Sequence, residues 1–91
     1  MTAAMEMREY VCECITALRA DDDTKESVLR KAAKALGISA GRAKSYYYRK
    51  VSLVRAEEAD LIREKIHEFH RRQFSNLKEE YERLKDEFND M

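Results

Sequence analysis

The chain has 91 residues, enough for one small domain and an extension. It contains no proline, two glycines and 40% charged residues, a composition that favours helices joined by short turns. No apolar stretch is long enough to cross a bilayer, and the N-terminus lacks the basic start and apolar core of a secretory signal. We therefore expect an all-α, soluble, cytoplasmic protein with no membrane partner.

The formal net charge is zero, but the charges are unevenly distributed along the chain. Residues 1–23 hold two basic and six acidic residues, a net charge of −4. Residues 24–55 hold nine basic residues and one acidic residue, a net charge of +8. Residues 56–91 hold seven basic and eleven acidic residues, a net charge of −4. The middle segment therefore attracts a polyanion, and the two ends repel it.

The first predicted helix covers residues 4–20. Its apolar side chains recur with helical spacing and form one stripe, made of Met7, Val11, Cys14, Ile15 and Leu18. Three aspartates at 21–23 end this helix, because acidic side chains are unfavourable at a helix C-terminus. Cys12 and Cys14 point to nearly opposite sides of the helix, so we expect two reduced thiols and neither a disulfide nor a shared metal ion.

The second predicted helix covers residues 25–36. Asp23 and Glu26 fit a capping box at its start, and Thr24 is an alternative cap. The side chains expected to be buried are Val28, Leu29, Ala32 and Leu36. Ala33 is small, which allows this helix and the next to cross closely.

A turn and a third helix, to about Lys50, follow. Gly37 tolerates the positive φ that the turn requires, Ile38 points inward, and Ser39 caps the helix. Ala43 and Tyr46 face the preceding helix. The side chains that point outward are small, polar or basic, namely Ala40, Gly41, Lys44, Ser45 and Tyr48. A helix with this outer face is suited to the major groove of DNA.

A long fourth helix is predicted from about Leu53 to Asn89, with Ser52 as its cap. Its first part places Leu61, Ile62, Ile66 and Phe69 against the domain. Apolar residues then alternate at spacings of four and three, a coiled-coil pattern formed by His70, Phe74, Leu77, Tyr81, Leu84, Phe88 and Met91. We expect residues 56–91 to form a homodimer through this seam; the alternative is a helix that folds back on its own domain.

The segment Leu29 to Tyr48, LRKAAKALGISAGRAKSYYY, resembles the helix–turn–helix of bacterial and phage transcriptional regulators. The resemblance rests on Ala33, Gly37 and Ile38, with apolar residues around them. It departs from the family pattern at Ala43, where a larger Val or Ile is usual. It implies that residues 1–55 form a DNA-binding domain, and that the helix after Ser39 enters the major groove of double-stranded DNA.

The resemblance also implies roles for individual residues. The base-facing set comprises Ala40, Gly41, Arg42, Lys44, Ser45 and Tyr48, with Arg42 and Lys44 as the guanine contacts. Ser39, at the start of the helix, is also among the expected DNA-binding residues. For Tyr48, the alternative is a stacking surface for single-stranded nucleic acid. The phosphate-binding set comprises Arg49, Lys50 and Arg55 after the helix, and Thr24, Lys25 and nearby backbone amides at the start of the second helix.

No catalytic set or phosphate-binding loop is present in the sequence, so we expect neither an enzyme nor a cofactor. Glu64, His67 and His70 have a helical spacing seen in metal sites, but the inward carboxylates that such sites take from neighbouring helices are missing. The expected function is sequence-specific DNA binding by a dimeric repressor or other regulator at the nucleoid. The alternatives are a protein-interaction module that uses the C-terminal helix (an adaptor, an antitoxin-like partner or a phage-encoded inhibitor) and a non-specific DNA-packaging protein.

Overall fold

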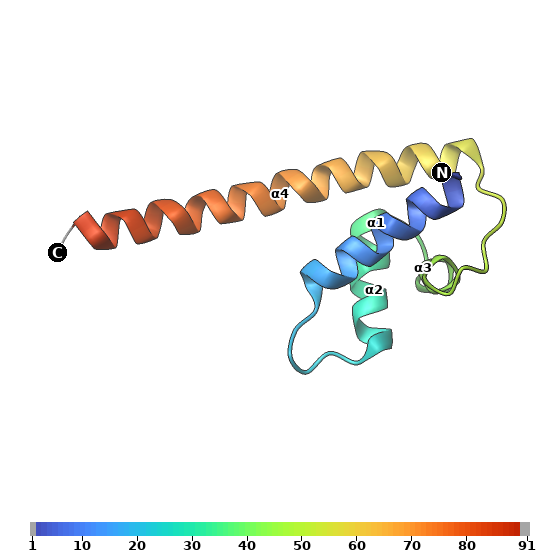
Figure 1. Cartoon of the computed structure of the whole chain (residues 1–91), viewed down its shortest axis with the longest axis horizontal. Helices are drawn as coiled ribbons and strands as arrows, with labels where there is room; N and C mark the ends of the chain where they lie inside the picture. The colour runs from blue at the N-terminus through green and yellow to red at the C-terminus, as the bar shows by residue number, and fades with distance from the viewer. Residues whose placement is uncertain (1, 90–91) are drawn as a thin grey trace.

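The computed structural model describes residues 2–89 and contains four α-helices and, within that range, no strand. Helix α1 covers Ala3–Leu18, α2 covers Lys25–Leu36, α3 covers Ala40–Tyr47 and α4 covers Ala56–Asn89. Figure 1 shows α1, α2 and α3 gathered along the first half of α4, while the second half extends alone. The all-helical prediction with a long C-terminal helix is confirmed. Met91, the last member of the predicted seam, lies outside the described residues.

One hydrophobic core joins all four helices. It is formed by Met7, Val11, Cys14 and Ile15 of α1, Val28, Leu29, Ala32, Ala33 and Leu36 of α2, Ala43 and Tyr46 of α3, and Ala59, Ile62, Ile66 and Phe69 of α4. Most of these residues were predicted to be buried. Leu18 is only partly buried. Leu61 is 37% exposed, which corrects the prediction, because it lies about 100° around α4 from the fully buried Ile62.

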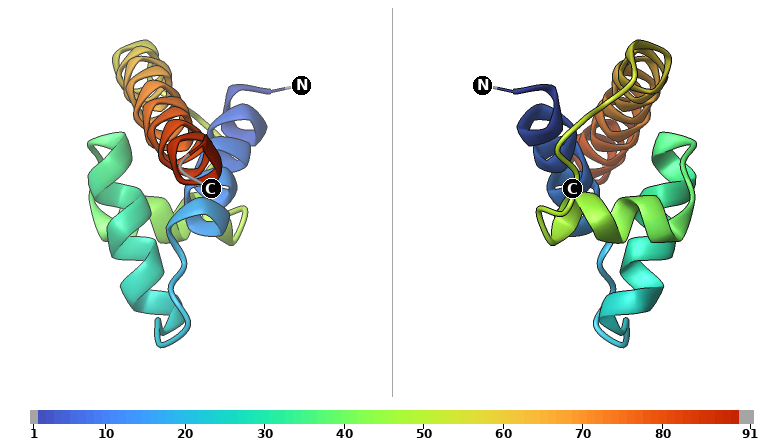
Figure 2. Two further views of the ribbon diagram at one scale, coloured as in Figure 1. Left: turned by 90° about the vertical axis from the view of Figure 1, so that its left-hand side faces the viewer. Right: turned by 90° about the vertical axis from the view of Figure 1, so that its right-hand side faces the viewer.

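The core extends past residue 55, where we expected one domain to end. The first half of α4 contributes buried side chains as far as Phe69, so we call residues 2–69 the body. The two end views in Figure 2 show α1 and α2 on either side of α4. Arg63 of α4 also binds Glu6 of α1 through two hydrogen bonds of 3.0 and 2.9 Å. Apolar burial and this bidentate ion pair together fix α4 to the body.

The connection between α1 and α2 corrects the predicted end of the first helix and selects Thr24, the alternative cap, for the second. Helix α1 ends at Leu18 and not at residue 20, because Arg19 takes an extended backbone conformation. Thr24 is the N-cap of α2, with its hydroxyl oxygen accepting from the Ser27 amide at 3.1 Å. Asp23 instead stabilises the preceding turn, where its carboxylate accepts from the Ala20 amide at 2.8 Å.

The connection between α3 and α4 is longer than predicted. Helix α3 ends at Tyr47, because Arg49 adopts a left-handed φ of 61° and the Lys50 amide donates back to the Ser45 carbonyl at 2.8 Å. Helix α4 begins at Ala56, so Ser52 is not its cap and Leu53, 84% exposed, is not helical. An ordered turn therefore replaces the last residues of one predicted helix and the first residues of the next.

The molecule is elongated because α4 is much longer than the body it packs on. The principal extents are 56 × 28 × 20 Å. Over residues 2–89, none of the helices has an apolar stretch of the length that crossing a bilayer requires.

Candidate nucleic-acid interface

The turn between α2 and α3 fixes the direction in which α3 leaves. Gly37 adopts φ 70°, and the Ile38 amide donates to the Ala33 carbonyl at 3.0 Å. This pattern closes the C-terminus of α2 and favours glycine at the left-handed position. The Ser39 hydroxyl oxygen then accepts from the Arg42 amide at 3.1 Å, as the sequence predicted, and caps α3.

Helix α3 has a buried face and an exposed face, arranged as its sequence predicts. Ala43 and Tyr46 are buried in the core. Ala40, Gly41, Lys44 and, just past the helix end, Tyr48 are exposed, and Arg42, Ser45 and Tyr47 are partly exposed. No bulky acidic or apolar side chain of α3 blocks this face.

A shallow hollow of about 180 Å³ separates the exposed face of α3 from the neighbouring face of α2. It is lined by Glu26, Leu29, Arg30, Ala40, Gly41 and Lys44. The Lys44 ammonium lies 3.9 Å from the Glu26 carboxylate, but both side chains are more than half exposed. Such a pair is weak in water, so it leaves Lys44 able to turn towards a bound anion.

Arg42 does not point outward with its neighbours. Its guanidinium donates to both carboxylate oxygens of Glu58, at 2.8 and 3.0 Å, and stacks on the Tyr46 ring with its central carbon 5.0 Å from the ring centre. The Tyr46 hydroxyl donates to the same carboxylate at 3.0 Å. The ion pair holds the pKa of Glu58 below its ordinary value, while burial and the bond to Glu58 raise the pKa of Tyr46 to about 12.

These contacts correct the expected position of Arg42. The sequence placed it among the base-facing residues as a guanine contact, but its side chain is committed to the start of α4. Arg42 therefore fixes the orientation of α3, and we leave it out of the candidate base-facing set.

The start of α2 lies next to the end of α3. The Lys25 ammonium lies 4.7 Å from the centre of the Tyr47 ring and 4.8 Å from that of Tyr48. The two rings meet edge to face, with centres 5.0 Å apart. The structure thus brings Lys25 together with Tyr48, two residues that the sequence assigned to the same interface from two separate segments. Because Tyr46 is buried, the three consecutive tyrosines do not form one exposed stacking surface.

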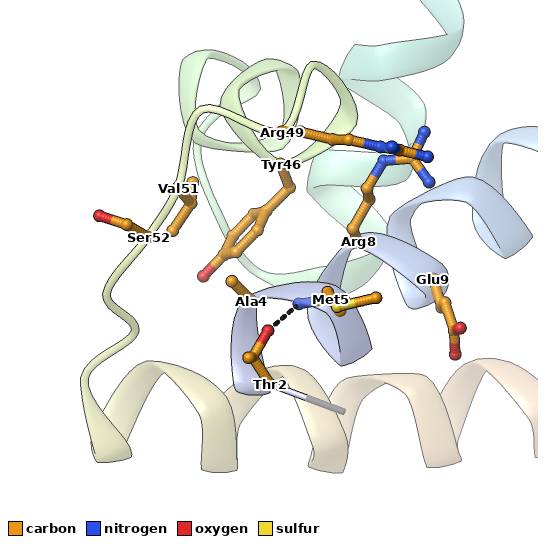
Figure 3. A pocket seen from close by; sticks show the side chains of 9 residues that line it. All are labelled: Thr2, Ala4, Met5, Arg8, Glu9, Tyr46, Arg49, Val51 and Ser52. Atoms are coloured by element: carbon orange, nitrogen blue, oxygen red, sulfur yellow. Dashed lines mark hydrogen bonds between the residues drawn. The ribbon is translucent and has the colours of Figure 1, made fainter.

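The turn after α3 presents more positive charge. Arg49, Lys50 and Arg55 are all exposed. Figure 3 shows Arg49 beside Arg8 of α1, at the rim of a hollow of about 420 Å³ that also contains Tyr46, Val51 and Ser52. The Arg8 guanidinium donates to the Tyr47 carbonyl at 3.2 Å and so satisfies the C-terminus of α3. Arg8 therefore supports the C-terminal end of α3.

Sequence reasoning missed Glu58 and Arg8. Each is far from α3 in the sequence and contacts it only in the folded chain, so no local spacing could identify it. Among residues 2–89, no three His, Cys, Asp or Glu side chains converge to hold a metal ion. His70 instead contacts Glu13 of α1 at 2.6 Å.

Comparison with protein-family models, curated proteins and solved structures yields no match for this chain. The geometry and charge of the chain's own residues therefore support the functional proposal below.

Proposed function

We propose that this chain binds double-stranded DNA through the exposed face of α3 and acts as a helix–turn–helix transcriptional regulator. One observation supports this most strongly. The outward residues of α3 are small, polar or basic, and they belong to the segment, residues 24–55, whose net charge is +8 with nine basic residues and one acidic residue. The major groove admits an α-helix, and a helix of this kind brings polar donors to base edges without steric obstruction.

The exposed residues divide into two groups by their chemistry. Lys44, Ser45 and Tyr48 reach base edges, with Lys44 donating to the acceptor atoms of guanine. Ala40 and Gly41 are small and allow the helix to approach the groove closely. The phosphate-binding residues are Arg49, Lys50 and Arg55 on one flank, and Thr24 and Lys25 on the other.

Two copies of the chain bind together in this proposal. Paired helix–turn–helix units read half-sites about 34 Å apart, one turn of the DNA helix, on a near-palindromic site. The acidic segments on either side of the basic one keep the rest of the molecule away from the phosphates.

Selection of bound sites from random duplex DNA, followed by salt titration, tests the proposal. We expect affinity to fall steeply with salt, and a selected site to bind at least ~1,000-fold more tightly than random duplex. Equal affinity for every duplex would make the chain a non-specific DNA-packaging protein. No binding at low salt would refute DNA binding.

A matched pair of charge variants locates the interface. Lys44→Ala is expected to weaken binding to the selected site by about 10-fold, because it removes a base-edge donor. Arg83→Ala removes the same charge from the exposed second half of α4 and is expected to leave the affinity within about 2-fold, because exposed charges beyond the Debye length are screened. Equal effects of the two variants would place the interface elsewhere.

One observation favours protein interaction as a second function. Five large apolar side chains on the second half of α4 are more than half exposed, namely Phe74, Leu77, Tyr81, Leu84 and Phe88. We call them the distal row. Exposed apolar patches of this kind mark surfaces that another molecule covers.

A further inference from the structure

The distal row begins where the body ends. Every buried side chain of the described residues lies at or before Phe69. Beyond it, Phe74 is 70% exposed and Phe88 is 71% exposed. Helix α4 nevertheless continues unbroken to Asn89. Most helical stability in proteins comes from packing of an apolar face, and these twenty residues lack the packing that stabilises the first half of α4.

The distal row does not continue the face of α4 that packs on the body. From Phe69, that face continues through Gln73, Asn76 and Glu80, which are polar. The distal row is offset from it by one residue, a rotation of about 100° around the helix. A helix folding back onto its own body would extend the first face. On the line of the row, the predicted seam residue His70 still contacts Glu13 of α1 at 2.6 Å, and the five residues beyond it are exposed.

The spacing of the row matches a two-stranded coiled coil. Phe74, Tyr81 and Phe88 take the first core position of each heptad, and Leu77 and Leu84 take the second. Leucine at the second position is typical of parallel dimers. A second copy of this chain carries an identical row, so the core positions of the two helices match along their length.

The charges beside the row select the orientation of the two helices. On one side lie Arg71, Lys78 and Lys85, all basic; on the other lie Gln73, Glu80 and Glu87, two of them acidic. In a parallel pair, each residue of the second side faces the residue five positions later in the partner, so Glu80 meets Lys85 in both directions. In an antiparallel pair, basic faces basic and acidic faces acidic. Only the parallel arrangement is complementary.

We propose that the distal row is the core of a parallel, in-register homodimer of α4, with the two bodies at the same end. This inference specifies the pairing of copies included in the proposed function, but it rests on α4 alone and not on DNA binding. Every measurement below is made without DNA. The dimer proposal can therefore fail while DNA binding holds, and DNA binding can fail while the dimer proposal holds.

The first measurement is the mass of the full chain in solution. Sedimentation equilibrium over a concentration series is expected to approach twice the 10.7 kDa chain mass. The variant Leu77→Gln with Leu84→Gln is expected to remain a monomer and to keep the unfolding free energy of the dilute unaltered chain, because neither residue is buried in the body. A monomer for the unaltered chain, a trimer, or an unchanged dimer in the variant would each overturn the proposal.

A charge-swapped chain tests the orientation. It carries Glu80→Lys, Glu87→Lys, Lys78→Glu and Lys85→Glu, which keep the composition and net charge unchanged. In a parallel dimer the swapped chain pairs with itself as well as the original does, but mixed pairs place like charges together. An affinity-tagged original chain is therefore expected to capture the untagged original and not the swapped chain. Efficient capture of the swapped chain would show an antiparallel pair and refute the parallel one.

Discussion

At the scale of single residues, the two glycines differ in what they contribute to stability. Gly37 has φ 70°, and a Cβ added there would lie 3.6 Å from carbon atoms of Lys65, whereas a Cβ added at Gly41 in α3 would have nothing within 4 Å. Gly37→Ala is expected to destabilise the protein by about 1–2 kcal/mol, because a left-handed conformation is costly for alanine. Gly41→Ala is expected to stabilise it by about 0.5 kcal/mol. Urea unfolding of both variants measures the difference, and a similar effect at both sites would contradict this reading of the turn.

Arg42 and Glu58 form another residue-scale test. Their hydrogen bonds are short and bidentate, but the side chains are 35% and 21% exposed. Solvent therefore weakens the pair, and we expect a coupling energy of about 1 kcal/mol from a double-mutant cycle of Arg42→Ala and Glu58→Ala. Additive effects of the two substitutions would mean that the ion pair does not hold α3.

At the scale of elements, the two halves of α4 have different roles. The first half is part of the core, and the second half contributes no buried side chain to it. The unfolding free energy of a chain ending at Gln73 is therefore expected to lie within about 0.5 kcal/mol of that of the monomeric full chain. Thermal unfolding of the truncated chain and of a dilute full chain provides the comparison. A truncated chain that does not fold would show that the body needs the distal half of α4.

The elements also differ in how far the sequence determines them. Helix α2 has the predicted bounds because Thr24 and Gly37 supply local signals at its two ends. The end of α3 was misplaced because Arg49 takes a left-handed φ of 61° without being glycine, so no sequence signal marks the turn. The exposed face of α3 was predicted from side-chain periodicity. The position of Arg42 was not, since its partner lies 16 residues further along the chain.

At the scale of the whole molecule, ion pairs between distant elements make stability depend on pH. Hydrogen bonds from Arg63 and Tyr10 lower the pKa of Glu6 from 4.5 to about 2. Because this carboxyl has a lower pKa in the folded protein, its contribution is present above pH 4.5 and is lost as the pH falls towards 2. Glu58, whose pKa is lowered chiefly by Arg42, acts in the same direction.

Acid titration of the unfolding free energy tests this dependence. The difference in stability between the unaltered chain and Glu6→Gln is expected to be constant above about pH 5 and to shrink between pH 4.5 and 2. Glu9→Gln changes an exposed carboxylate one turn away and serves as the control. A stability difference that is independent of pH would show that the Glu6–Arg63 pair does not tie α1 to α4.

Helix α4 runs from the Arg42–Glu58 ion pair, which holds α3, to the distal row at the far end of the molecule. With 34 residues and neither proline nor glycine, it forms a continuous rod about 50 Å long. Glu58 lies in the first turn of α4 and binds Arg42, and Phe88 lies in the last turn. One uninterrupted backbone therefore links the residue that binds Arg42 to the exposed end of the molecule, so whatever covers Phe88 is held at a fixed distance from α3.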